Sequence, residues 1–223
     1  MDISMRAYVS PIGYDSSRVT RTVISNGLDT DDWIILLRPA IEMDDNRATQ
    51  AIRDVRQMLS QVEPDTSITI EEIPHDDYEA AVTRICEILD AFDGELILNL
   101  SGGPRDILLA LSTAAFVYHD SIAEYLSYSD IDGEVRSLPI PNLVVDTPSA
   151  SFRTLEVIED FGRPVSISEL TEAREIAKST ITRHLQQLES RKLVDTWQEG
   201  KAKFTDITFT GRLMVRTKAD TNR

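Results

Sequence analysis

The sequence predicts an α/β protein in which a doubly wound, mainly parallel sheet is followed by a smaller helix–turn–helix domain with a β-wing. Two observations support this fold class. Over the first two thirds of the 223 residues, short apolar segments alternate with amphipathic helical patterns, which is the order that produces parallel βαβ units. In the last third, three closely spaced helical patterns precede two strand patterns joined by a turn.

Charge divides the chain at the same place. Residues 1–149 carry 10 Lys and Arg against 27 Asp and Glu, whereas residues 150–223 carry 13 against 11 and include all five lysines. Because phosphates repel an acidic surface, the second part is the better candidate for binding nucleic acid. Pro139, Pro141 and Pro148 interrupt regular structure between the two parts. We therefore expect a domain at 1–140, a linker at 141–150 and a second domain at 151–223.

Composition also bears on the environment of the protein. A net charge of −15 with few lysines is typical of adaptation to a very salty cytoplasm, so we expect a halophilic source. The single cysteine, Cys86, cannot form an intrachain disulfide and fits a reducing cytosol. Neither a signal-like N-terminus nor an apolar run of about 18 residues is present, which predicts a cytoplasmic protein without a membrane partner.

The elements of the first domain follow in order from their apolar periodicity and their capping residues. The first strand is expected at Arg6–Ile12, and Asp15 or Ser16 can cap the helix that Asn26-Gly27 then ends. Trp33–Leu37 is nearly all apolar, as a central parallel strand would be, whereas Ser67–Ile73 alternates like an edge strand. Further helices are expected at Asp45–Val62, Asp76–Ala91 and Arg105–Tyr118, and further strands at Leu96–Leu100, Ile122–Ser129 and Glu134–Pro139.

The segment from Glu95 to Asp106 has the clearest functional pattern in this domain. An apolar strand ends at Ser101-Gly102-Gly103, and a helix begins at once with Pro104 in or near its first turn. Adjacent glycines allow positive φ and a close approach of the backbone to a ligand, and the free N–H groups of a helix N-terminus favour an anion. Arg105 adds a positive charge there. The pattern predicts a phosphate pocket, although a Gly-Gly pair after a strand is often only a turn.

The second domain reads as a winged helix–turn–helix. Helices are expected at Phe152–Phe161, from Ser166 and at Lys178–Leu188, followed by strands from Leu193 and over Phe204–Phe209. The third helix should direct hydroxyls, amides and one guanidinium outward, and the turn between the strands should carry two lysines. The predicted DNA-binding residues are Ser179, Thr180, Thr182, Arg183, Gln186, Gln187, Lys201 and Lys203. His184 is expected to be a partly exposed helix residue, and no His/Cys cluster suggests a metal site.

This domain resembles the winged helix–turn–helix regulators of the MarR and ArsR kind. The resemblance rests on Ser168-Glu169-Leu170, on the segment from Lys178 to Leu185 and on Leu193-Val194. The sequence departs from the pattern where Glu175 and Lys192 stand at positions that usually hold glycine. Winged helices also serve as protein-binding modules, but the polar third helix and the basic turn favour DNA.

The first domain resembles the CRISPR-associated Rossmann-fold (CARF) domains that are fused to a C-terminal winged helix. Three segments carry the resemblance: Pro11 to Asp15 with Arg18 and Arg21, Asn26-Gly27-Leu28, and Asn99 to Arg105. With the winged helix it spans nearly the whole chain. One departure is Pro104, where the family often has Thr or Ser.

The resemblance implies a homodimeric CRISPR-associated transcriptional regulator with a role in antiviral defence. Its effector would be a cyclic oligoadenylate, typically cyclic tetra-adenylate, bound across the twofold axis, and its other partner would be double-stranded DNA at CRISPR-related promoters. The implied ligand-binding residues are Ile12, Gly13, Tyr14, Asp15, Arg18, Asn99, Ser101, Gly102, Gly103, Pro104 and Arg105.

Two alternatives remain open at the level of sequence. Some CARF domains cleave their cyclic ligand, but the glycine loop contains no histidine or lysine that could act as general acid or base, so no catalytic residue is assigned. The other alternative is a constitutive DNA-binding protein whose CARF domain stays empty, which Pro104 would favour. No cofactor other than the effector is expected.

Overall fold

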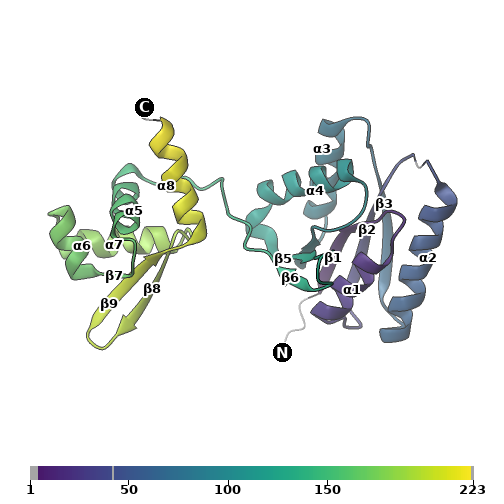
Figure 1. Ribbon diagram of the computed structural model, residues 1–223, viewed down its shortest axis with the longest axis horizontal. Helices are drawn as coiled ribbons and strands as arrows, with labels where there is room; N and C mark the ends of the chain where they lie inside the picture. The colour runs from purple at the N-terminus through teal and green to yellow at the C-terminus, as the bar shows by residue number, and fades with distance from the viewer. Residues whose placement is uncertain (1–4, 42, 222–223) are drawn as a thin grey trace. The chain divides into compact units, whose positions relative to one another are not determined.

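The computed structural model describes residues 5–41 and 43–221 and divides the chain into two compact units, 1–140 and 141–223 (Figure 1). The first unit contains a sheet with the strand order β3-β2-β1-β4-β5-β6, in which β1 to β5 are parallel and β6 is antiparallel to β5. This topology confirms the predicted doubly wound, mainly parallel sheet. Its strands are β1 (Arg6–Pro11), β2 (Trp33–Pro39), β3 (Ser67–Ile73), β4 (Glu95–Asn99), β5 (Ile122–Tyr128) and β6 (Val135–Ser137).

Helices cover both faces of this sheet, so each face has its own hydrophobic core. One core joins the strands to α1 (Ser17–Asn26) and α2 (Asp45–Val62) through residues such as Val23 and Val55. The other joins them to α3 (Tyr78–Asp90) and α4 (Arg105–Val117), and a short 3-10 turn, η1 (His119–Ser121), precedes β5. Figure 1 shows the two pairs of helices on opposite sides of the strands. The strand order reverses between β1 and β4, which is where open α/β sheets bind ligands.

Two element boundaries differ from the sequence prediction for local reasons. Helix α3 begins at Tyr78 and not at Asp76, because the Asp77 carboxylate caps the helix by accepting from the Ala80 N–H at 3.0 Å. Strand β6 covers only three residues of the predicted Glu134–Pro139, since Pro139 has no N–H with which to continue the ladder. Ser67–Ile73 does lie at the edge of the sheet, as predicted.

The second unit is a winged helix, which confirms the other half of the predicted fold class. It comprises α5 (Ser149–Phe161), β7 (Val165–Ser166), α6 (Ile167–Arg174), α7 (Lys178–Glu189), β8 (Val194–Glu199), β9 (Ala202–Ile207) and α8 (Phe209–Thr221). The strands form an antiparallel sheet in the order β7-β9-β8. Helix α5 begins three residues before the predicted Phe152, and the hairpin turn is tighter than predicted, so the returning strand starts at Ala202 and not at Phe204.

Glu175 and Lys192 both adopt positive φ, of 52° and 56° respectively. The resemblance to winged helix–turn–helix regulators implied glycine at these two positions, and the positive φ values show that both turns have the backbone geometry that favours glycine. We expect Glu175→Gly to raise the free energy of unfolding of the second unit by about 0.5–1 kcal/mol, because relief of left-handed strain outweighs the added freedom of the unfolded chain. Chemical denaturation of the full chain would measure this, and equal or lower stability would contradict it.

Candidate functional site

A cavity of about 740 Å³ lies at the carboxyl ends of the strands in the first unit. Loops that follow β1, β2, β3 and β4 all contribute to its wall, together with the β5–β6 turn and the first turns of α4. From the predicted ligand-binding set, the wall contains Gly13, Tyr14, Asp15, Arg18, Gly102, Gly103, Pro104 and Arg105. The two loops that the sequence singled out therefore meet at one site.

The glycine loop lies against the end of β1 at a separation that only glycine permits. Gly102 and Gly103 have φ of 81° and 67°. A Cβ atom added to Gly103 would lie 2.5 Å from Pro11 Cβ and 3.0 Å from its backbone carbonyl carbon. At Gly102 the nearest atom would be Arg18 Cδ at 2.8 Å, the end of a flexible side chain. The loop is thereby held over the first strand, where its backbone borders the cavity.

Three predicted ligand-binding residues do not line this cavity with their side chains. Ile12 is buried in the core, and its N–H donates to the Leu37 carbonyl at 2.9 Å. Asn99 is buried and donates to Ser10 Oγ at 2.8 Å, while the Ser101 hydroxyl donates to Asn99 Oδ1 and accepts from the Tyr128 N–H at 3.0 Å. These hydrogen bonds hold the glycine loop in place, so Asn99 and Ser101 stabilise the cavity wall without lining the cavity themselves.

Arg18 is already paired within the cavity wall. Its guanidinium lies 2.8 Å from Asp130 Oδ2 and 3.6 Å from Asp15 Oδ2. Hydrogen bonds from Ser17, with a further contribution from Arg18, lower the pKa of Asp15, so this carboxylate stays ionised near neutral pH. An anionic ligand at Arg18 must therefore compete with carboxylates that already hold the guanidinium. The guanidinium of Arg47 stacks over the Tyr14 ring at 4.6 Å from its centroid and orients that ring from α2.

Pro104 occupies the position just before α4, with φ −64° and ψ 141°. Helix α4 itself starts at Arg105, and its first intrahelical bond runs from the Leu108 N–H to the Pro104 carbonyl at 3.0 Å. The N–H groups of the helix's first turn therefore remain in place at the cavity edge. Proline removes one N–H and the hydroxyl of a Thr or Ser, and it leaves the helix terminus intact.

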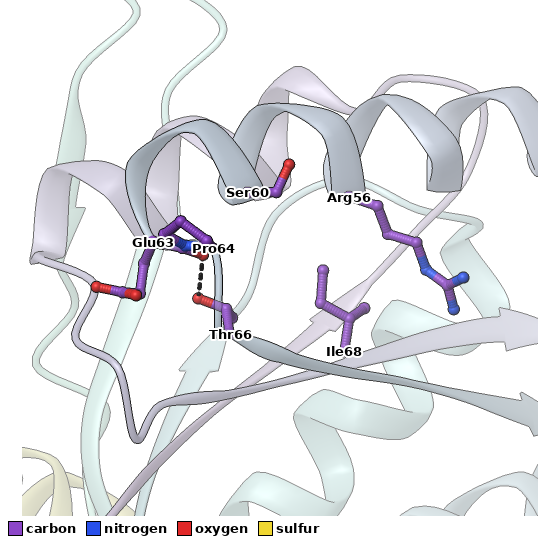
Figure 2. A pocket seen from close by; sticks show the side chains of 6 residues that line it. All are labelled: Arg56, Ser60, Glu63, Pro64, Thr66 and Ile68. Atoms are coloured by element: carbon purple, nitrogen blue, oxygen red, sulfur yellow. Dashed lines mark hydrogen bonds between the residues drawn. The ribbon is translucent and has the colours of Figure 1, made fainter.

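The tertiary structure adds wall residues that the sequence analysis missed. Pro39 is the last residue of β2, Ile41 and Met43 follow that strand, and His75 follows β3. Leu108, Asp106 and Asp130 complete the wall. The order of the predicted strands could have indicated these residues, because in a parallel sheet the loops that follow neighbouring strands lie at the same edge. A separate hollow of about 350 Å³ lies where α2 turns into β3, at the amino ends of the strands (Figure 2), and is no part of this site.

In the second unit, helix α7 presents only part of the predicted DNA-binding set to solvent. Ser179, Arg183 and Gln186 are exposed, and Thr180 and Thr182 are half-buried, with the Thr182 hydroxyl donating to the Lys178 carbonyl. Gln187 differs from the prediction, because its Oε1 accepts a hydrogen bond from the Ser151 hydroxyl of α5. Gln187 thus holds α7 to its neighbour and contributes less to the outer face.

The wing carries one lysine at its tip where two were predicted. Lys201 follows Gly200, which makes the turn with φ of 61°, and Lys201 is exposed. Lys203 lies inside β9, because the hairpin is tighter than expected, and its Nζ is 3.8 Å from Glu189 Oε2 on α7. The charge of Lys203 is partly engaged within the unit, whereas Lys201 is exposed.

His184 corrects another prediction, since it is buried and not partly exposed. The residue is 3% exposed, and its Nδ1 lies 2.8 Å from the Thr154 hydroxyl of α5. Loss of solvation lowers the pKa of His184, and the charges of Arg183 and Arg174 act in the same direction. The neutral ring is therefore a structural contact between α5 and α7.

This burial predicts a pH dependence for the second unit. Below about pH 6.5 the unfolded state takes up a proton on His184 that the folded state resists, so stability falls as pH falls through that value. Calorimetric unfolding at pH 7.5, 6.5 and 5.5 should show a steeper decline for the natural protein than for His184→Gln. Parallel declines in the two proteins would contradict this assignment.

The two units define a class of protein in which a Rossmann-like pocket domain is joined to a winged helix–turn–helix. The Csa3 CRISPR-associated Rossmann-like domain matches residues 6–137, which is more than half of the chain, and the MarR family matches residues 145–199. The chain therefore belongs to the Csa3 family of CRISPR-associated Rossmann-like proteins. This is the architecture of a CRISPR-associated transcriptional regulator, as the sequence resemblance implied.

Solved structures similar to this chain include MarR-type regulators. A mutant MarR of E. coli complexed with operator DNA is 20% identical, with 32% of this chain and 53% of that chain covered and a TM-score of 0.30. FabT of Streptococcus pneumoniae in complex with DNA is 20% identical, with 34% and 55% covered and a TM-score of 0.32. The chain thus spans just over half the length of these proteins. No curated protein matches it. Within the described residues, no helix is long and apolar enough to span a bilayer.

Proposed function

We propose that the protein is a homodimeric, DNA-binding transcriptional regulator whose affinity for CRISPR-related promoters is controlled by a cyclic oligoadenylate, most simply cyclic tetra-adenylate. The observation that carries this proposal is the cavity at the strand carboxyl ends, which combines a glycine loop, a helix N-terminus and two arginines in a chain that also holds a winged helix. Backbone N–H groups and guanidinium groups are the donors that phosphates prefer.

Support for a dimer comes from an unpartnered apolar face on α4. Leu109, Phe116 and Val117 are 58%, 36% and 65% exposed, and they lie along the helix whose first turns border the cavity. Exposed apolar side chains in a row favour burial against another surface. A second copy packed on this face would bring two cavities together, which suits a ring-shaped ligand with twofold symmetry.

DNA control requires that ligand binding favour one arrangement of the two winged helices over another. Titration of cyclic tetra-adenylate in molar KCl should change affinity for the protein's own promoter by at least about fivefold and raise the melting temperature. Arg105→Ala should reduce both responses, because it removes a phosphate contact. Unchanged promoter affinity and melting temperature in the natural protein would overturn ligand control and favour a constitutive DNA-binding protein.

The assigned DNA face leads to a prediction about specificity. Arg183 is exposed in the middle of α7, where a guanidinium can read guanine in the major groove, whereas Lys201, exposed at the wing tip, suits contact with phosphate. Arg183→Ala should lower affinity for operator DNA about tenfold more than for random DNA, and Lys201→Ala should lower both alike. Competition binding with the two DNAs measures this, and equal losses for both variants on both DNAs would contradict it.

Ring cleavage is a second candidate function because His75 lies in the cavity wall, although the glycine loop itself lacks an acid or base. Incubation with cyclic tetra-adenylate distinguishes the candidates. A regulator without nuclease activity should leave the ring intact, whereas linear products that disappear in His75→Ala would favour cleavage.

A further inference from the structure

The cavity has two ends of different chemical character. Beside β1 and β4 lie Arg18, Arg105 and the backbone of the glycine loop, which together suit phosphate. Beyond β2 and β3 lie three apolar side chains and one imidazole, from Pro39, Ile41, Met43 and His75. The two ends belong to one continuous cavity, so a ligand with a charged part and a planar, weakly polar part can occupy both.

The His75 ring has one nitrogen that is sealed off and one that is free to act. Nδ1 is buried and has no hydrogen-bond partner within residues 5–41 and 43–221, and His75 is one of the residues that line the cavity. Buried N–H groups without a partner are rarer in proteins than buried acceptors without one, so we place the proton of the neutral ring on Nε2. His75 therefore offers the cavity one N–H donor, at Nε2.

The surroundings of His75 make phosphate the wrong occupant of this end. Asp76 and Asp77 follow His75 directly, and Asp44 and Asp45 stand at the start of α2 after the apolar segment. Asp77 and Asp44 cap their helices as carboxylates, and Asp45 pairs with Arg38 at 2.7 Å. The residues that line this end, Pro39, Ile41, Met43 and His75, include no arginine or lysine, so a phosphate would find no permanent positive charge there. A purine has apolar faces and ring nitrogens that accept hydrogen bonds, so it fits both the side chains and the donor.

We propose that His75 is the base-recognition residue of the cavity, donating from Nε2 to an acceptor nitrogen of a purine whose face packs on Pro39, Ile41 and Met43. The inference rests on the proposed function in so far as the effector is a nucleotide, and it names the part of the site that selects the base.

The same assignment bears on ring cleavage by His75. A general base must carry the proton it accepts, and the resulting imidazolium would place an unpaired N–H of Nδ1 in a buried position. His75 is thus suited to recognition and poorly suited to proton transfer.

Nitrogen NMR on the full chain with ¹⁵N-labelled histidine tests this directly, because the protein has only three histidines and His75→Gln identifies the His75 signals. In the free protein, the neutral form of the His75 ring should be the Nε2–H tautomer. Adenosine 5′-monophosphate at millimolar concentration should shift the Nε2 signal, and ribose 5-phosphate, which has no base, should leave it in place. An Nδ1–H tautomer, or the absence of a selective response to the nucleotide, would overturn the proposal.

Calorimetry with cyclic tetra-adenylate then separates this inference from the proposed function. We expect His75→Ala to weaken binding about tenfold, as the loss of one hydrogen bond predicts, and His75→Gln to retain most of the affinity through its amide donor. Arg105→Ala serves as the matched control at the phosphate end. If the natural protein binds the ring and His75→Ala binds equally well, base recognition by His75 is wrong. If the natural protein binds no ring while its His75 signal still responds selectively to the nucleotide, the proposed effector is wrong and the base site stands.

Discussion

Replacing Gly103 by alanine is expected to lower the free energy of unfolding of the first unit by about 3 kcal/mol. Two costs add at this position. The left-handed backbone, with φ of 67°, costs an L-residue about 1–2 kcal/mol, and the new Cβ overlaps Pro11 Cβ at 2.5 Å, for which overpacking costs are about 1–3 kcal/mol. Since the nearest atoms belong to a rigid proline, the strand and loop must separate to make room. Calorimetry should show the transition of this unit lowered by about 6–12 °C.

Gly13→Ala is the matched control on the facing loop. A Cβ added to Gly13 would meet Gly103 Cα at 3.4 Å, which is an ordinary contact, and Gly13 does not have positive φ. The melting temperature of the Gly13→Ala protein should therefore stay within a few degrees of that of the natural protein. Because Gly103 also borders the cavity, Gly103→Ala should lose its response to cyclic tetra-adenylate. A Gly103→Ala protein as stable as Gly13→Ala would show that the loop is held more loosely than its packing indicates.

Placing a carboxylate on the apolar face of α4 should convert the proposed dimer to a monomer. Leu109→Glu would put an ionised group into the proposed interface twice, once from each copy, and burying an unpaired carboxylate is costly even where molar salt screens repulsion between the two charges. A monomer engages only one half-site, so affinity for a two-half-site promoter should fall on the order of 100-fold. Sedimentation velocity and promoter binding would measure the two effects.

Met58→Glu provides the control, because Met58 is 48% exposed on α2, a helix that packs on the other face of the sheet. This variant makes the same change of charge and should remain dimeric with natural promoter affinity. Neither substitution should alter folding much, since both side chains are largely in solvent. If Leu109→Glu behaves like Met58→Glu, or if the natural protein is a monomer, the α4 face is not the dimer interface.

Local patterns were sufficient to predict the fold class. The parallel sheet follows from the alternation of apolar strands such as β2 with helices that have one apolar face, because that order requires crossover connections and two covered faces. Capping residues predicted most helix starts to within a few residues. Short segments were harder, and β7 was missed entirely, since a two-residue strand has no periodicity and exists only through its pairing with β9.

The candidate site was only partly predictable for the same reason. Residues next to the glycine pair could be found from the chain, because glycines and a helix start leave a local signal. Whether Asn99 and Ser101 face the cavity or hold the loop depends on Ser10 and Tyr128, which are distant in sequence. His184 likewise becomes buried through Thr154, a partner 30 residues away.

The sequence by itself determined the two-domain architecture, the family resemblance and the glycine loop beside the start of a helix, because periodicity, charge and turn residues act over a few neighbouring positions. Only the tertiary structure decided which polar side chains form internal hydrogen bonds and which reach the cavity. Only the tertiary structure places His75 and the apolar residues at the end of β2 in the same cavity wall as the glycine loop. The reason is that the strands are parallel, so the loops that follow β2, β3 and β4 lie at the same edge of the sheet.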